Sequence, residues 1–350
     1  MQTDRRSFMR ATGAAALLGA TGVAGCGSIL GGGGGSGSWI YDPRVMADVP
    51  NTGFGSMAYG TLYDNRDELP QSMRESFQTN PDSPLQPEDI DNFAGSGGGD
   101  IADDGSSGAA FGSVAVTGSI PRSELENEVE SGDSVESAGS YEGYSLYTAA
   151  NVDEDVGPVP GPGSFSGSGA VAVGDDAVVV GVSWSSGMDL GVNGEAAVRT
   201  MIDASRGNAR RLSATDGPAK RVQDRIGDSM LVVGAEVDPD LVSLGQQLGG
   251  GMGGQILTGL RGGGLGIDVD GETSTYQAVV VYESESAATE AGLADLVSGM
   301  GGRFEEQPGI DSLESEQDGA MVIITLTGDT ETLAQQGAGV GSNFALADPR

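Results

Sequence analysis

The chain has 350 residues, enough for one large domain or two of ordinary size. Its 17 lysine and arginine residues stand against 51 aspartate and glutamate residues, a formal net charge of -34 at pH 7. There is no histidine and one cysteine. This composition excludes disulfides within the chain, histidine-based catalytic triads, Cys/His zinc sites and haem ligation by histidine, and the charge disfavours binding to nucleic acid.

The excess of acidic residues indicates the solvent in which the protein folds. So many carboxylates repel one another, and the repulsion is tolerable where the Debye length is about 3 Å, as near 1 M salt. Lys220 is the only lysine, and every other basic residue is an arginine. This composition resembles that of proteins from extremely halophilic archaea, which implies folding in concentrated salt.

Residues 1–25 have the pattern of an export signal. Arg5 and Arg6 are followed by an aromatic, an aliphatic and a basic residue, and this arrangement resembles a twin-arginine signal peptide. The apolar run from Ala11 to Ala24 is diluted by glycine and threonine. It is too short to cross about 30 Å of hydrocarbon as a stable helix, so we expect a signal rather than a permanent anchor.

A lipidation site follows the signal. Val23-Ala24-Gly25-Cys26 resembles a lipobox, which implies that the Cys26 thiol receives a lipid. Residues 26–38 then consist of this cysteine and a Gly/Ser-rich stretch that predicts a flexible tether. The expected location is the outer face of the cytoplasmic membrane, where the extracellular body is held by the lipid on Cys26.

The mature chain predicts an α+β fold with mixed, largely antiparallel sheets and amphipathic helices. β-type runs precede amphipathic stretches, as at 114–116 before 120–130 and at 278–282 before 286–297. Residues 170–181 read as a hairpin with an acidic turn at Gly174-Asp175-Asp176.

A faint internal repeat predicts two related α+β halves, residues 39–227 and 228–350. Residues 56–60 resemble residues 229–233, and each segment begins a strand that precedes a helix. The glycine-rich stretch 245–266 lies inside the second half and is expected to form a loop. Residues 95–108 and 157–169 are expected to be loops as well.

No pattern predicts a cofactor or metal. The glycine-rich stretches do not complete a dinucleotide-binding pattern, and no Gly-Lys-Ser or Gly-Lys-Thr occurs. Residues 268–272 lack the spacing of a calcium loop and favour a hairpin turn, while the acids of 100–104 follow from composition. Tyr141, Tyr144 and Tyr147 suggest either a sugar platform or packing. Packing is favoured, because Tyr144 and Tyr147 point to opposite faces of a strand.

Basic residues gather in one short stretch, where Val198, Met201 and Ile202 give the first of two helices an apolar face. Gly207 is expected to end that helix, and Pro218 and Gly227 to frame the second. The basic side chains are then expected on the solvent side. They either balance nearby acids or form a docking patch for anionic lipid or an acidic partner. The members of this basic patch are Arg199, Arg206, Arg210, Arg211, Lys220, Arg221 and Arg225.

The leading functional hypothesis is a non-enzymatic, lipid-anchored envelope protein that binds or organises a partner at the membrane surface. A solute-binding lipoprotein that serves a transporter is one alternative. A carboxylate-based hydrolase is the other, since two acids facing each other about 5 to 10 Å apart could act on a glycosidic bond. The abundance of acidic residues leaves no particular pair to name.

Overall fold

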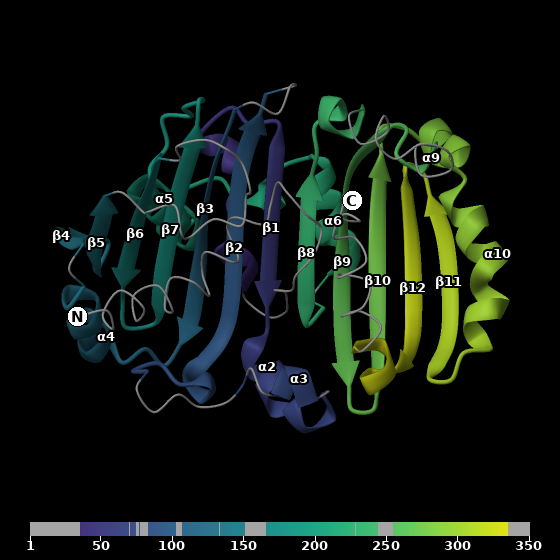
Figure 1. Ribbon diagram of the computed structural model, residues 1–350, viewed down its shortest axis with the longest axis horizontal. Coiled ribbons are helices and arrows are strands. Elements are labelled where there is room, and N and C mark those ends of the chain that lie inside the picture. Colours follow the sequence, from purple (N-terminus) through teal and green to yellow (C-terminus); the bar gives the residue numbers. More distant parts are fainter. Residues whose placement is uncertain are drawn as a thin grey trace, which may run out of the picture.

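The computed structural model describes residues 36–69, 71–74, 77, 83–102, 107–132, 134–150, 166–227, 229–243 and 255–334. These residues form one twelve-stranded sheet with helices on both faces (Figure 1). The strand order across the sheet is β11-β12-β10-β9-β8-β1-β2-β3-β7-β6-β5-β4, and every neighbouring pair is antiparallel.

The strands are β1 (Asn51–Met57), β2 (Ile90–Ile101), β3 (Gly108–Gly118), β4 (Val135–Tyr141), β5 (Tyr144–Ala150), β6 (Ser166–Val173), β7 (Ala177–Ser186), β8 (Leu231–Glu236), β9 (Leu260–Asp270), β10 (Thr273–Tyr282), β11 (Ile310–Asp318) and β12 (Met321–Asp329). The α-helices are α2 (Tyr59–Asp64), α3 (Gln71–Arg74), α4 (Arg122–Glu130), α5 (Gly194–Arg206), α6 (Pro218–Ile226), α9 (Glu285–Ala291) and α10 (Leu293–Glu305). Short 3-10 turns are η2 (Ser36–Ser38), η3 (Pro43–Val45), η4 (Arg66–Glu68), η6 (Pro87–Asp89) and η8 (Leu212–Ala214).

The predicted fold class is wrong, because the described strands form a single antiparallel sheet rather than mixed sheets. β1 pairs with β8, from Thr52 opposite Glu236 to Met57 opposite Leu231. The sheet therefore runs without a break across the predicted boundary at 227/228, with β1 to β7 on one side of the β1–β8 pairing and β8 to β12 on the other. Local hydrophobic patterns locate strands, but the pairing of β1 with β8 is a long-range contact that no local pattern contains.

Helices α5 and α6 cover one face of the sheet, which we call the α5–α6 face. Helix α5 packs on β3, β6 and β7, and α6 packs on β8, β9 and β10. The predicted apolar face of α5 is confirmed, since Val198, Met201 and Ile202 are fully buried. Val222 of α6 is also fully buried and belongs to the same core. This core is the largest in the described part of the molecule.

Glycines in the strands let these helices approach the sheet closely. A Cβ atom on Gly181 of β7 would lie 2.4 Å from the carbonyl oxygen of Gly194 in α5. A Cβ atom on Gly264 of β9 would lie 2.3 Å from the Cγ1 atom of Val222 in α6. Larger residues at these positions would push the helices off the sheet.

Parts of three predicted loops are strands. Residues 95–101 belong to β2, residues 166–169 to β6 and residues 260–266 to β9, although all three stretches were expected to lie in loops. Glycine has a low intrinsic strand preference, but pairing on both sides and close helix packing outweigh it here. Residues 103–106, 151–165 and 244–254 lie outside the described residues.

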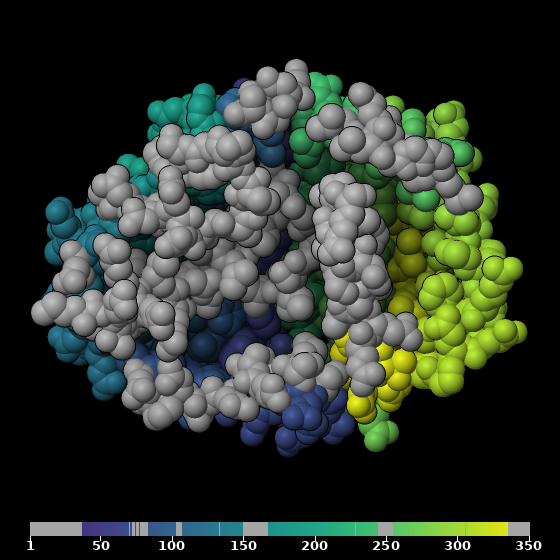
Figure 2. Space-filling model, in the orientation of Figure 1, coloured from purple at the N-terminus to yellow at the C-terminus, as the bar shows by residue number. Residues whose placement is uncertain are grey.

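The opposite face carries helices near its two ends. Leu125 and Val129 of α4 pack with Val180 of β7 at one end. At the other end, Ala288 and Ala291 of α9 pack with Tyr282 and Val322, and α10 lies along β11. Figure 2 shows this side of the molecule, with α9 and α10 at the yellow-green end. Among the described residues, no helix is long and apolar enough to cross a membrane.

Several local predictions are confirmed. Gly207 follows α5 in the left-handed conformation, with φ of 79°, and Pro218 is the first residue of α6. Gly227 caps α6 with φ of 67°. β6 and β7 form the predicted hairpin around Asp175 and Asp176. These features depend on residues a few positions apart, which is why the sequence contains them.

Candidate functional site

The predicted site residues divide between described and undescribed parts of the chain. Arg5, Arg6 and Cys26 lie outside the described residues. The basic patch lies on α5, on α6 and on the connection between them. In Figure 1 these helices lie behind the sheet, on the α5–α6 face. The patch is therefore on one side of the molecule, but its members have different surroundings.

The N-terminal segment is fixed to this same face. The relative exposure of Trp39 is 8%, and Ile40 and Tyr41 are fully buried in the core beneath α5 and α6. The backbone N–H of Asp42 donates to the carbonyl of Arg210 at 3.0 Å, and Leu212 donates to Ile40 at 3.0 Å. We call this pairing of residues 40–42 with 210–212 the latch, because it joins the N-terminal segment to the α5–α6 connection.

A buried carboxylate strengthens the latch. Asp42 is 2% exposed, and its Oδ1 accepts a hydrogen bond from the backbone N–H of Arg44 at 3.1 Å. Its Oδ2 accepts from the guanidinium of Arg210, which forms an ion pair with it. The side chain of Arg44 continues to Glu236 of β8 at 2.7 Å. Since a buried carboxylate requires a partner, Arg210 serves the fold and its charge is compensated.

The ring of Tyr41 reaches below the latch. Its hydroxyl donates to the carbonyl of Ser96 at 3.3 Å and accepts from the Ser113 hydroxyl at 3.3 Å. Burial raises the pKa of Tyr41 well above its usual value, although the hydrogen bond from Ser113 opposes the shift. The N-terminal segment is thus part of the core rather than a loose extension.

On α5, Arg199 contacts groups of its own protein. Its guanidinium pairs with Glu195 one turn earlier at 2.7 Å and lies 4.4 Å from the centre of the Tyr141 ring. The Tyr141 hydroxyl donates to Asp203, at 2.9 Å to either carboxylate oxygen. Burial, followed by Asp203, raises the pKa of Tyr141. These contacts attach the outer hairpin β4–β5 to α5.

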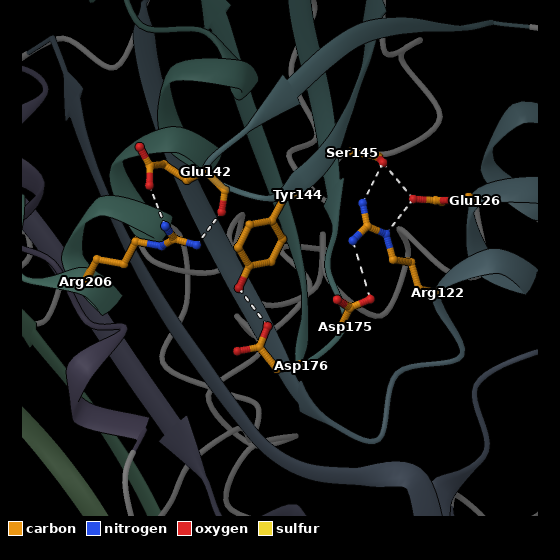
Figure 3. A network of polar contacts seen from close by, with 8 residues as sticks. All are labelled: Arg122, Glu126, Glu142, Tyr144, Ser145, Asp175, Asp176 and Arg206. Carbon is orange, nitrogen blue, oxygen red and sulfur yellow. Dashed lines mark hydrogen bonds and ion pairs between the residues drawn. The ribbon is translucent and has the colours of Figure 1, made fainter.

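Arg206 holds the turn of the same hairpin (Figure 3). Its guanidinium pairs with the Glu142 carboxylate and also donates to the Glu142 carbonyl. Glu142 has φ of 50°, the one positive value found outside glycine among the described residues. The Arg206 guanidinium lies 6.0 Å from the centre of the Tyr144 ring. The Tyr144 hydroxyl donates to the Asp176 carboxylate at 3.1 Å. Arg206 therefore stabilises a backbone conformation that glutamate rarely adopts.

A second polar network in Figure 3 joins α4 to the sheet. Arg122 donates to Glu126 at 2.8 Å and to Ser145 at 3.0 Å, and it contacts Asp175 at 3.4 Å. The Ser145 hydroxyl donates to Glu126 at 2.6 Å. The hydrogen bond from Arg122, followed by that from Ser145, lowers the pKa of Glu126. A carboxylate with a lowered pKa stays ionised at neutral pH, so Glu126 is a poor general acid.

The three tyrosines do not form one aromatic platform. Tyr144 joins the core of the α5–α6 face, whereas Tyr147 packs in the cluster on the opposite face. Tyr147 donates to Glu130 at 3.1 Å, and burial followed by this contact raises its pKa to about 12. The expectation that Tyr144 and Tyr147 point to opposite sides is confirmed.

The remaining basic residues are less fully compensated. Arg211 donates to the carbonyls of Ala204 and Ser205 at the end of α5, at 2.7 and 3.0 Å. Lys220 pairs with Asp224 on the surface of α6. Arg225 lies 3.8 Å from the exposed carboxylate of Glu316.

Arg221 is exposed on α6, and no described carboxylate forms an ion pair with it. Within the described part of the basic patch, Arg211 and Arg221 are therefore the members without an ion pair to a carboxylate. For this part of the basic patch, docking and charge balance both stay predictions.

Two features of the structure are not predicted by the sequence patterns. The first is the latch, whose signal is the apolar run Trp39-Ile40-Tyr41 directly after the glycine-rich tether. The second is an aromatic cluster at one end of the sheet, where Tyr59 lies 5.4 Å from Phe77 and 5.3 Å from Phe93. Phe77 is 7% exposed, so packing accounts for this cluster. No group of three acidic residues in the described ranges could hold a metal ion.

Comparison with known proteins finds no family model and no curated protein that matches this sequence. Three solved structures of TP0453 resemble it. Crystal form III has a TM-score of 0.41 at 11% identity, covering 90% of this chain and 99% of that chain. Form I has a TM-score of 0.41 at 10% identity, covering 88% and 97%. Form IV has a TM-score of 0.39 at 12% identity, covering 87% and 99%. These values are too low to assign a fold family or activity.

Proposed function

We propose that this is a non-enzymatic, lipid-anchored envelope protein, exported through a twin-arginine signal and held at the outer face of the cytoplasmic membrane by a lipid on Cys26. The latch is the observation that carries this proposal. The covalent chain links the lipid to the body, and the latch fixes the point at which that chain joins the fold. Here the segment after the tether is buried at Ile40 and Tyr41 and is joined to the α5–α6 connection.

The length of the tether suits this role. Ser36, the first described residue, follows Cys26 by ten positions, and an extended chain of that length spans at most about 36 Å. Glycine and serine dominate it, so it leaves the body free to turn above the membrane. The lipid supplies the attachment, and the latch transmits it to the sheet.

The two alternative functions gain little support. A solute-binding protein of the two-lobed kind closes two bodies around its ligand, whereas the described residues share one continuous sheet. A carboxylate hydrolase needs a general acid with a raised pKa, whereas the pKa of Glu126 in the Arg122–Ser145 network is lowered.

Replacing the lipid acceptor tests the proposed function. The wild-type chain and Cys26→Ser are expressed in a host with twin-arginine export, and membranes are separated in concentrated salt. We expect the wild type in the membrane fraction, with a lipid mass on an N-terminal peptide that begins at Cys26. Cys26→Ser should be released or remain an unprocessed precursor, whereas Ser28→Ala, a matched change in the tether, should behave as wild type. Retention of processed Cys26→Ser in the membrane would contradict the proposal.

A further inference from the structure

The outward side of α6 is a surface where positive charges outnumber negative ones. Ala219, Val222 and Ile226 are buried against the sheet, and their helical spacing leaves the other side to solvent. That side carries three basic residues and one acidic residue. We call Lys220, Arg221, Asp224 and Arg225 the α6 surface.

The surroundings of the α6 surface differ from those of α5. On α5, Arg199 and Arg206 each have a carboxylate at close range and an aromatic ring beside it. On α6, Asp224 compensates Lys220, and the nearest carboxylate to Arg225 is 3.8 Å away. Because the whole chain carries a net charge of -34, most of its surface is repelled by anionic groups. On the α6 surface, three basic residues oppose this repulsion.

The tether leaves the body beside this surface. A Cβ atom on Gly37 would lie 3.9 Å from Nε2 of Gln223, which is in the middle of α6. The turn η2, which contains Gly37, also contacts α5 and β1. The chain therefore enters the described body beside α6, and the eleven positions from Cys26 to Gly37 span at most about 40 Å of extended chain.

We propose that the α6 surface docks on the anionic headgroups of the bilayer that holds the lipid. This inference rests on the proposed function, because the lipid brings α6 near the membrane. In concentrated salt the Debye length is only a few Å, so charges act at contact range and set orientation rather than supply the attachment. The guanidinium of Arg221 can bind a headgroup phosphate directly, and Lys220 and Arg225 flank it. The α5–α6 face then points to the membrane and the opposite face points away.

Reporters on the two faces test this orientation. Ser213 is exposed in η8 between α5 and α6, and Ser286 is exposed on α9 at the opposite face. Each is changed to cysteine in the full-length lipidated protein, in which the lipid occupies the Cys26 thiol, and is labelled with a fluorophore. The proteins are reconstituted at native salt in vesicles of phosphatidylglycerol and phosphatidylcholine that contain a headgroup quencher. We expect at least about twofold stronger quenching at Ser213→Cys than at Ser286→Cys.

Charge variants make the test specific. Arg221→Gln with Arg225→Gln should remove the difference between the two reporters, as should vesicles of phosphatidylcholine alone. Arg261→Gln with Arg303→Gln removes the same charge from elsewhere and should leave the difference intact. Equal quenching at the two reporters in anionic vesicles, or a difference that survives loss of Arg221 and Arg225, would overturn the docking proposal.

Failure of α6 docking can be told apart from failure of the lipid anchor. Sedimentation of the lipidated protein with vesicles reports the anchor, whatever its orientation. If the protein sediments and both reporters are quenched equally, the lipid anchor stands and docking through α6 is wrong. If wild-type protein isolated from membranes carries no lipid on Cys26, the proposed function fails, and docking fails with it.

Discussion

Helices α5 and α6 pack on the same face of the sheet above glycines, but they use their basic residues differently. On α5, Arg199 and Arg206 contact tyrosines and acids of the β4–β5 hairpin. On α6, Arg221 projects from the surface without a described ion pair. A run of basic residues that looks uniform in the sequence therefore divides into an internal clamp and an outward surface. The neighbours of each helix, rather than its own composition, make the difference.

Lowering the salt concentration should have the largest effect, because it acts on all carboxylates together. The body is expected to lose structure as salt falls below roughly 1 M, since repulsion between acidic side chains is then less screened. Circular dichroism between about 3 M and 0.1 M salt measures this loss. A constant unfolding midpoint over that range would show that the acidic surface does not require salt.

Filling the space between α5 and the sheet should have the next largest effect. A Cβ atom on Gly181 would meet the Gly194 carbonyl at 2.4 Å and Cγ2 of Val198 at 2.8 Å. Gly181→Ala is therefore expected to lower the free energy of unfolding by about 3 kcal/mol, because backbone atoms cannot move aside cheaply. Gly299→Ala in α10 is the control, since its Cβ would meet nothing within 4 Å. The free energy of unfolding of the control should rise by about 0.5 kcal/mol or more, because alanine favours a helix more than glycine does. Equal denaturant midpoints for the two variants would contradict the close packing of α5 on Gly181.

Matched ion-pair variants compare the two helices directly. Arg206→Gln should cost about 1 kcal/mol, because Arg206 also holds the carbonyl of Glu142 at its positive φ. Lys220→Gln, which removes a pair within α6, should cost less than about 0.5 kcal/mol. Urea unfolding at native salt measures both. If Lys220→Gln is the more destabilising of the two, the division into clamp and outward surface is wrong.

High pH should destabilise the fold through ionisation of Tyr144, an effect that is absent near neutrality. Burial, followed by Asp176, raises the pKa of Tyr144 above its usual value of about 10. The folded state then keeps a proton that the unfolded state loses. The stabilisation is complete below about pH 10 and is lost as the pH rises toward the folded-state pKa. Tyr144→Phe should flatten this loss in unfolding measured from about pH 9 to 11, and an unchanged slope would contradict the assignment to Tyr144.

The sequence alone determined features that depend on neighbouring residues. The apolar face of α5 at Val198, Met201 and Ile202, the end of α5 at Gly207 and the start of α6 at Pro218 all follow from spacing and backbone preference. The acidic hairpin turn between β6 and β7 follows in the same way. The lipobox and the twin-arginine pattern also come from local sequence, and they stay predictions because they lie outside the described residues.

Only the tertiary structure decided how distant segments meet. The pairing of β1 with β8 makes one sheet of what the sequence divides in two, and Arg210 meets Asp42 across 168 positions. Gly264 lies in a glycine-rich stretch that the sequence predicts as a loop. Glycine is needed there because α6 packs closely against β9, and the local pattern does not show where α6 lies. Pairing and close approach are properties of segments brought together by folding. A window of a dozen residues contains the preference of each segment but not its partner.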